Sequence, residues 1–475
     1  MQLKKGKKRC AGLIRETIAT LSLGLATASA VGAPDAAAGI FTDSEFNVAT
    51  GLPNLPYTQF DGALLLYQES GGRVQATEPT IEMTVHGRDN RQLSLEATAD
   101  TVTGATPNGA VPSDKTQAFV TPLKAAGSSV TVTTASGGST VIQLPPTPGQ
   151  IAAAALGRQY TIAPNTLPVD RAFYDERKAG NFAWSQPLGP IDTIGFGGGY
   201  STERDYRSIT ANANVAQSFN MNNTTLSLTF NFEDDSSFPY GGVPMPLTQM
   251  NAQWKSPSSR GKTQIDLLFG LTEVMTRRWL MQINYSYAQS NGYQNDPYRV
   301  ISVVDQTTGE PLQYLYEARP NVRSQHSIYW DNKFDFGLSV TDASLRYYTD
   351  SWGLKAETAE LSDRIAITSW LSLEPDVRWY RQTAASFFNN YLVGGVPPPA
   401  YASSDFRLGS FSALTYGGQI DVNLTNAIDL YVRGQYYDQT GNGHPVNAVG
   451  QLKNQNLFAG VSATSVILGL TWTIH

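Results

Sequence analysis

The sequence contains very little cysteine, and this scarcity excludes several kinds of chemistry. Its 475 residues include one cysteine, Cys10, in a basic stretch near the N-terminus. A chain without further cysteines forms no internal disulfide, no thiolate metal site and no c-type haem attachment, and it lacks a cysteine nucleophile. No motif for another cofactor is present, so the sequence predicts no cofactor and no metal site.

Long apolar runs are also absent. No stretch of about eighteen consecutive apolar residues occurs, so no transmembrane helix is predicted. The run from Ile18 to Ala28 is shorter, follows a basic head and precedes the small-residue pattern Ala28-Ser29-Ala30. This order is typical of a cleaved secretory signal peptide. We expect a signal peptide over residues 1–30, a periplasmic segment over 31–56 and one domain over 57–475.

An excess of basic charge is missing as well. The chain has 34 Lys and Arg against 40 Asp and Glu, and its first 30 residues hold six of these basic groups and one acidic group. Removal of the signal peptide would therefore leave a formal charge of −11. Because no basic stripe remains, nucleic acid is excluded as a partner.

Helical periodicity is scarce, and a period of two residues takes its place. Only the segment near Ile151 looks helix-prone. In "LMQINYSY", Met281, Ile283 and Tyr285 alternate with Gln282 and Asn284, which is typical of a strand with two unlike faces. In a soluble sandwich the apolar face would point inward, whereas in a membrane barrel it points outward to lipid.

Roughly sixteen such strands follow one another along the chain. They span 58–69, 72–87, 91–106, 172–187, 190–205, 209–221, 224–236, 261–274, 277–291, 321–333, 336–350, 354–368, 370–385, 406–424, 427–440 and 457–475. Tight connections alternate with mostly longer ones, of which 107–171 is the longest. This sorting is typical of outer-membrane barrels, with periplasmic turns and external loops, and a sandwich does not require it. We predict an all-β fold, a transmembrane antiparallel up-and-down β-barrel with both termini in the periplasm.

Charged residues recur on one face of strand after strand, and that face is predicted to line the lumen. The candidate lumen-lining residues are Glu82, Glu96, Asp100, Asp266, Asn284, Arg323, Arg346, Asp376, Arg378, Asp429 and Arg433. Both signs occur on single strands, as with Asp376 and Arg378. These charges could therefore form an ion-selective ladder, or they could cross-brace the wall.

Aromatic residues near predicted strand ends are expected at the headgroup level of a membrane. They are Tyr57, Tyr200, Trp279, Tyr287, Trp330, Trp352, Trp370, Tyr437 and Trp472. The chain ends on His475 and departs in this respect from the terminal aromatic residue usual in outer-membrane proteins.

No catalytic constellation is evident, so no enzyme is predicted. His326 has Ser324 and Ser327 nearby, but adjacent strand residues point to opposite faces, which separates His326 from Ser327. The glycines of "GFGGGY", Gly195 to Tyr200, lie inside a predicted strand and favour close packing over phosphate binding. Asp234 and Asp235 could hold Ca²⁺ weakly, although solvated loop charge is the simpler interpretation.

Several segments resemble a family of Gram-negative envelope proteins. They are "LLLYQESGGRVQATEP", "DTVTGATPNGAVPSD", "LPVDRAFYDERKAGNFAWSQPL", "NYSYAQSNGYQNDPYRVISVVD", "YLYEARP", "RYYTDSWG" and "DFRLGSFSALTYG". The family is known as a domain of unknown function that is predicted to form outer-membrane barrels. The resemblance brings no activity and no catalytic residues. It implies an outer-membrane location and neighbours such as flavin-attaching and thioredoxin-like proteins, which would fit envelope electron transfer.

The leading functional prediction is a channel or transport pore for small solutes in the outer membrane. The alternative is a scaffold or sheath for an envelope partner, such as a periplasmic protein, lipoprotein or redox carrier. Outer-membrane lipids and the outer-membrane assembly machinery are expected partners in both cases. Within the loop 107–171, residues 151–170 are expected to dock at the wall or mouth, and residues 125–148 to stay exposed. If this loop is the constriction, its deletion should raise conductance.

Overall fold

The computed structural model describes residues 56–121, 129–133, 139–143, 158–250 and 254–474. The predicted signal peptide, nearly all of the predicted periplasmic segment and most of the helix-prone stretch near Ile151 lie outside these residues. Within the described residues, no helix is both long enough and apolar enough to cross a membrane.

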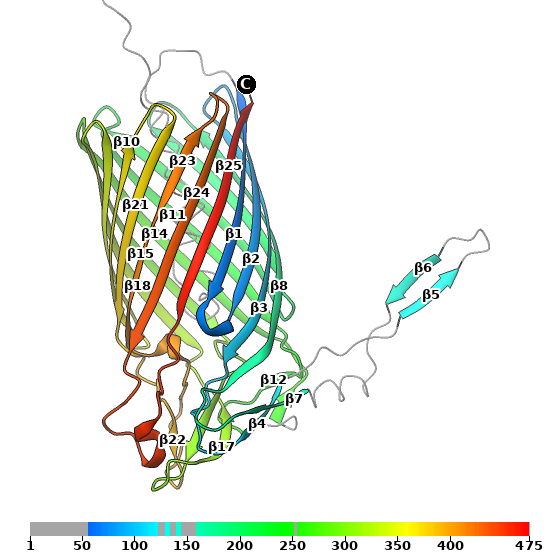
Figure 1. The fold of residues 1–475 in the computed structure, drawn as a ribbon. Helices are drawn as coiled ribbons and strands as arrows, with labels where there is room; N and C mark the ends of the chain where they lie inside the picture. Colours follow the sequence, from blue (N-terminus) through cyan, green and yellow to red (C-terminus); the bar gives the residue numbers. More distant parts are fainter. Residues whose placement is uncertain (1–55, 122–128, 134–138, 144–157, 251–253, 475) are drawn as a thin grey trace, which may run out of the picture.

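Sixteen antiparallel strands form one closed barrel (Figure 1). In order around the ring they are β1 (Tyr57–Glu69), β2 (Gln75–His86), β3 (Gln92–Pro107), β8 (Val169–Pro187), β9 (Asp192–Thr202), β10 (Tyr206–Phe219), β11 (Thr224–Ser237), β14 (Arg260–Thr276), β15 (Trp279–Gly292), β18 (Val322–Asp335), β19 (Ser339–Asp350), β20 (Lys355–Ala366), β21 (Leu371–Gln382), β23 (Phe411–Asn423), β24 (Ile428–Gly441) and β25 (Ser462–Ile474). Strand β1 pairs with β25, which removes both sheet edges. The predicted fold class and strand count are confirmed.

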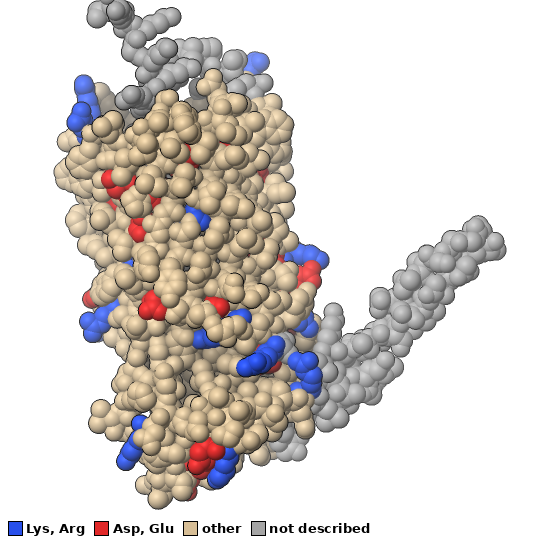
Figure 2. All heavy atoms as spheres, viewed as in Figure 1, with Lys and Arg blue, Asp and Glu red and all other residues tan. Residues whose placement is uncertain are grey.

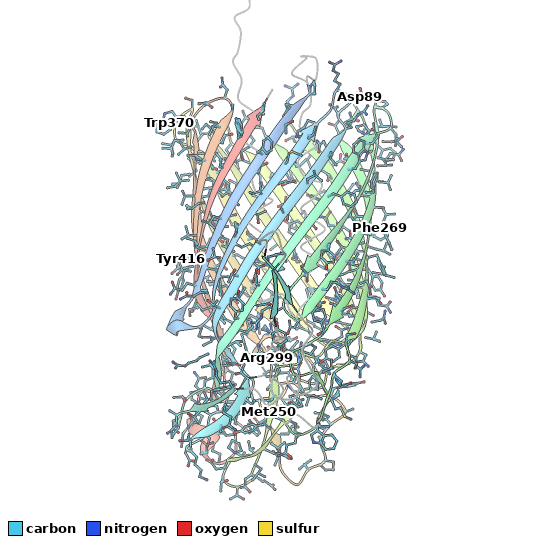
Figure 3. The ribbon with its side chains drawn as sticks, turned by 90° about the vertical axis from the view of Figure 1, so that its right-hand side faces the viewer. Asp89, Met250, Phe269, Arg299, Trp370 and Tyr416 are labelled. Atoms are coloured by element: carbon cyan, nitrogen blue, oxygen red, sulfur yellow. The ribbon has the colours of Figure 1, made fainter. Side chains whose placement is uncertain are left out.

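The faces of the strands follow the sequence alternation. On β15, Ile283 is 37% exposed on the outer face, whereas its neighbour Asn284 is 7% exposed on the inner face. Phe269 and Tyr416 likewise project from the outside of the wall (Figure 3). An apolar exterior around a polar interior is the arrangement that a lipid environment stabilises.

The two ends of the barrel differ, as the connections predicted. At one end, short turns such as 277–278 and 336–338 join the strands, and Gly337 adopts a left-handed φ of 90° there. Tyr57 and Ile474, the first and last residues of the barrel, lie at this tight-turn end (Figure 1). The other end carries the long connections.

At the long-loop end, the described parts of five connections form one structure, which we call the cap: residues 108–121 with 158–168, 238–250 with 254–259, 293–321, 383–410 and 442–461 (Figure 1). Its central sheet has the order β17 (Pro311–Tyr316), β16 (Val300–Val304), β22 (Leu392–Val393). Every residue of β16 is buried. Two further pairs, β4 (Gln117–Thr121) with β7 (Arg158–Ile162) and β12 (Val243–Pro244) with β13 (Lys255–Ser256), belong to the cap.

The connection between β3 and β8 is more structured than its composition suggested. Phe119 of β4 and Ile162 of β7 are buried against Val300 and Tyr316 of the cap sheet. Residues 158–162 therefore pack into the cap core at the mouth of the barrel. Residues 151–157, and most of the segment 125–148 that is expected to stay exposed, lie outside the described residues. The strands β5 (Ser129–Thr133) and β6 (Ser139–Gln143) form a separate hairpin that pairs only with itself.

The interior is not uniformly polar, in contrast to the simple two-face prediction. Leu65, Tyr67, Tyr431 and Ile467 form an inward apolar cluster on β1, β24 and β25. Because Phe406 of the cap packs against this cluster, these inward side chains are shielded from the water of the lumen and can be apolar.

Candidate functional site

The inward face of the wall carries all eleven candidate lumen-lining residues, alternating with exposed apolar neighbours. Asn284, Arg323, Asp100, Asp376 and Arg433 are buried there. The others are partly exposed, namely Glu82, Glu96, Asp266, Arg346, Arg378 and Asp429. Ten of these residues lie on two parts of the wall with different charge pairing, and Asn284 lies on β15 between those parts.

The part of the wall formed by β18–β21, β23 and β24, which we call the paired wall, contains charges in close ion pairs. Nitrogen–oxygen distances are 2.6 Å for Arg323–Asp350, 2.8 Å for Lys333–Asp342 and 2.9 Å for Arg364–Asp421. Arg433 lies 3.8 Å from Asp376, and the guanidinium of Arg346 lies over the ring of Tyr329. On this wall the cross-bracing interpretation describes the contacts.

Arg323 is the most enclosed of these bases. Its guanidinium donates to Asp350 and lies 4.3 Å from the ring centre of Trp352, which is 2% exposed. The prediction that Trp352 lies at the headgroup level is therefore wrong, because its indole fills a turn core and donates to the Val322 carbonyl. Tyr437 is also packed inward, while Trp330, Trp370 and Trp472 are exposed on the outside.

The part formed by β1–β3, β8–β11 and β14, which we call the acidic wall, contains more carboxylates than bases. Its inward acids include Asp61, Glu78, Glu82, Glu96, Asp100, Asp175, Glu233, Asp235 and Asp266. Arg177 pairs with Asp100 at 2.6 Å and with Glu78 at 3.7 Å, and Lys262 pairs with Asp235 at 2.8 Å. Glu82 and Glu96 face each other directly across β2 and β3.

The glycines of β9 make room for amide side chains on this wall. A Cβ at Gly195 would lie 2.1 Å from Oδ1 of Asn214, and one at Gly199 would lie 2.1 Å from Oδ1 of Asn181. Glycine is required because neighbouring side chains fold over the strand. The sequence-based expectation of close packing at "GFGGGY" agrees with these contacts.

The cap lies across the mouth of the barrel, because loops from separated points of the rim bond to one another. Val300 N–H donates to the Asn108 carbonyl, and Ser404 Oγ donates to the Gly109 carbonyl. Gln451 of the loop before β25 donates to the carbonyl of Pro112. The loop after β3 thus touches loops attached after β15, β21 and β24.

A network of buried charges joins two of these loops where the cap meets the barrel. Arg319 contacts Glu317 at 2.7 Å and Asp405 at 2.9 Å. Arg407 contacts the same Asp405 at 2.6 Å. The network continues through Asp296 and Arg299, whose nitrogen–oxygen distance is 3.1 Å. We call Asp296, Arg299, Glu317, Arg319, Asp405 and Arg407 the latch, and Figure 3 shows Arg299 at the junction, with Met250 further into the cap.

Four of the six latch residues, Arg299, Glu317, Arg319 and Asp405, are buried, and Asp296 and Arg407 are partly exposed at the edge of the network. Burial alone would raise the pKa of Asp405, but Arg299, Arg407 and Arg319 together hold this pKa well below its ordinary value. Burial raises the pKa of Glu317 despite its contact with Arg319. Arg299 also donates to the carbonyl of Pro107 at the end of β3, so the latch ties the cap to the wall.

A cavity of about 210 Å³ lies beside the latch. Its lining is mostly apolar and includes Phe388, Phe406 and Phe458, with the guanidinium of Arg299 as its charged group. The cavity is bounded by cap loops and the end of β3, so its shape depends on how the cap sits on the barrel.

Carboxylates also gather on the rim between β8 and the β9–β10 turn. One oxygen each of Asp175, Glu203 and Asp205 lies within 4.8 Å of the others. Burial raises the pKa of Glu203 to about 8, and the nearby charge of Asp175 adds to the effect. Tyr298 of the cap donates to Asp205. Such a trio has the oxygen ligands that hard cations prefer, although exposed acidic groups often occur without one.

The histidines do not form a catalytic site among the described residues. His326 is exposed on the outer wall, where its Nδ1 lies 2.9 Å from the hydroxyl of Tyr285. Ser327 is buried on the opposite face, as strand alternation predicted. His86 stacks on Tyr57 at the tight-turn end.

Sequence reasoning missed the latch and Asp61. The latch residues lie in "NDPYRV", "YLYEARP" and "DFRLGS", inside segments that carry the family resemblance. Charged residues beside apolar ones in long loops were the available signal. Asp61 was hidden because the following run "ALLLY" does not alternate.

The fold, the polar inward face and the apolar exterior together define an outer-membrane-type β-barrel whose mouth carries a packed cap. Residues 21–472 match the family described as "Protein of unknown function (DUF3570)", and the chain belongs to that family. No curated protein matches the sequence.

Solved structures with a similar fold include a mutant of the ferric enterobactin receptor from Pseudomonas aeruginosa, at 9% identity and a TM-score of 0.38, covering 87% of this chain and 59% of that one. CdiB from Acinetobacter baumannii is similar at 8% identity and a TM-score of 0.42, covering 87% and 60%. The chain thus spans about 60% of the length of these structures.

Proposed function

We propose that this protein is an outer-membrane channel for small solutes and that the cap gates its mouth. The tight-turn end faces the periplasm, and the cap faces the outside. The observation that supports this proposal is the inward face, on which charged side chains such as Glu82, Glu96 and Asp266 stay partly exposed within the barrel. A barrel of this strand number is wide enough to leave an aqueous path.

The cap supplies the constriction that such a channel needs. Its core is buried and its loops cross the mouth, so passage of a solute requires the cap to loosen or shift. The latch is a suitable holding point, because three carboxylates and three arginines meet there with short contacts. The contacts of Arg319 with Asp405 and of Arg407 with Asp296 join two cap loops, so a shift that separates these loops must break them.

Planar-bilayer recording tests this proposal. Deleting residues 108–165 removes Phe119 and Ile162 from the cap core and should raise single-channel conductance. The matched control is deletion of residues 129–143, because β5 and β6 pair only with each other and should leave conductance unchanged. Equal conductance of all three proteins would reject the cap as the constriction.

A scaffold for an envelope partner is the second candidate, and any role in extracytoplasmic electron transfer would come from that partner. The observation that favours it is the set of apolar side chains exposed on the cap, namely Met245, Leu312, Val396 and Tyr401. Absence of conductance from wild type and deletion variant alike, together with a protein that co-purifies from native membranes, would support the scaffold. We infer no enzymatic activity in either case.

A further inference from the structure

Three carboxylates lie side by side on the inward face of β1, β2 and β3. Asp61 is the direct cross-strand partner of Glu82, and Glu82 is the direct partner of Glu96. Like charges placed directly opposite one another on a sheet repel and destabilise it. We call these three residues the carboxylate row.

The carboxylate row is not neutralised by neighbouring bases. Among the described residues, no Lys or Arg forms an ion pair within 4.0 Å with any of the three. Their hydrogen-bond donors are uncharged: Gln59 and Thr471 for Asp61, Thr84 and Ser94 for Glu82, and Thr98 and Asn181 for Glu96. These three partly exposed carboxylates therefore face the lumen without a base beside them.

A second observation on the same wall points to a positively charged or donating ligand. Asn214 of β10 is 9% exposed, and its amide oxygen has no hydrogen-bond donor. Oxygens of Asn212 and Asp266 on this inward face also lack donors. Asn212, Asn231 and Asp266 are successive cross-strand partners on β10, β11 and β14, so a second row of acceptor side chains lies on the acidic wall.

We propose that the lumen admits cations in preference to anions and that Asp61, Glu82 and Glu96 provide this preference. The inference rests on the proposed channel function and specifies its solute class as small hydrated cations or cationic organic molecules. A channel lined by one sign of charge between low-dielectric walls raises the local concentration of the opposite ion by about tenfold or more.

A comparison with the paired wall explains why we assign the cation preference to the carboxylate row and not to other charges of the lumen. There, Arg323, Lys333 and Arg364 each have a carboxylate within 2.9 Å, so the opposing fields largely cancel at a distance. On the acidic wall, by contrast, the carboxylate row has no base at such a distance among the described residues.

The test is the reversal potential of the full-length protein in planar bilayers under a KCl gradient. Wild type should favour K⁺ over Cl⁻ by about tenfold, and the double variant Glu82→Gln/Glu96→Gln should bring this ratio close to that of free solution. The matched control is Glu176→Gln/Glu357→Gln, which removes two carboxylates from the exposed outer side of β8 and β20 and should retain the wild-type ratio.

The possible outcomes separate this inference from the channel proposal. An open channel that prefers anions, or a double variant with the wild-type ratio, would overturn the cation preference and leave the channel in place. A control variant that loses the preference as fully as the double variant would also overturn it, because total charge would then be responsible. Absence of conductance from wild type would overturn both proposals.

Discussion

The paired wall and the acidic wall are built from the same strand geometry and the same residue types, yet they treat charge in opposite ways. On the paired wall, Arg323 and Asp350 are buried in contact with each other. On the acidic wall, Glu82 and Glu96 oppose each other without a base and remain partly exposed. Buried charges need partners, whereas unneutralised charges need water or ions. The paired wall therefore stabilises the fold, whereas the acidic wall contains the carboxylate row to which we assign the cation preference.

The same contrast separates lumen and cap. The latch keeps Asp405 at 0% exposure and surrounds it with arginines. Figure 2 shows Lys and Arg side chains gathered near the boundary between barrel and cap on the face it presents. The latch charges join two cap loops and the end of β3, while the carboxylate row faces the lumen.

Breaking the paired wall should have the largest effect. The variant Arg323→Gln leaves Asp350 buried without its cation, and we expect the free energy of unfolding to fall by about 3–5 kcal/mol. Urea unfolding in detergent micelles, followed by tryptophan fluorescence, measures this change. If the free energy of unfolding falls by less than about 1 kcal/mol, the Arg323–Asp350 pair contributes no more than an exposed surface ion pair. The distinction between the two walls would then not hold.

Placing a charge on the outer face should have the next largest effect. Ile283→Arg should destabilise the barrel by about 2–4 kcal/mol if Ile283 lies near the midplane of the membrane. Gln282→Arg is the matched control, because the same side chain would enter the lumen side of β15 and should be tolerated far better. Folding titrations into lipid vesicles compare the two variants, and equal losses would show that the faces are inverted.

The rim carboxylates should make stability depend on pH. The folded-state pKa of Glu203, about 8, lies above the ordinary value of a glutamate. Its contribution to stability is therefore fully present below that ordinary value and is lost as pH rises through about 8. The melting temperature should fall with rising pH in wild type and fall less in Glu203→Gln. Parallel curves for the two proteins would contradict this account.

Changing the acidic wall should have the smallest effect on stability. Glu96→Gln removes one charge from a like-charged pair and retains a group of similar shape. We expect the free energy of unfolding to stay within about 0.5 kcal/mol of wild type, with any change toward greater stability because repulsion is relieved. The urea assay described for Arg323→Gln gives this value. A large fall in the free energy of unfolding would mean that the negative charge of Glu96 itself is needed to stabilise the fold.

The strands were predictable because their signal is local. Ile283 and Asn284 are adjacent, and their alternation places them on opposite faces of the strand, while the sorted loop lengths identify the apolar face as the outer one. The latch was not predictable, since Arg319 and Asp405 are 86 residues apart and meet only after two loops cross the mouth. The ion pairs among the lumen charges could not be predicted either. Arg323 and Asp350 lie on neighbouring strands, and the register between these strands is known only from the folded barrel.

The central claim is that solutes pass through the lumen only when the cap moves. Ala318 and Ala402 belong to two different cap loops and exchange two backbone hydrogen bonds of 2.9 Å. Paired residues of this kind lie within disulfide distance, and the chain's own cysteine, Cys10, lies in the predicted signal peptide. The double variant Ala318→Cys/Ala402→Cys can therefore lock the two loops together.

Single-channel conductance of that variant, recorded before and after reduction, is the decisive measurement, with Ala402→Cys alone as control. We predict low conductance while the disulfide is intact, recovery to the wild-type value on reduction, and no response in the single variant. Full wild-type conductance with the disulfide demonstrably formed would contradict the claim that the cap gates the channel.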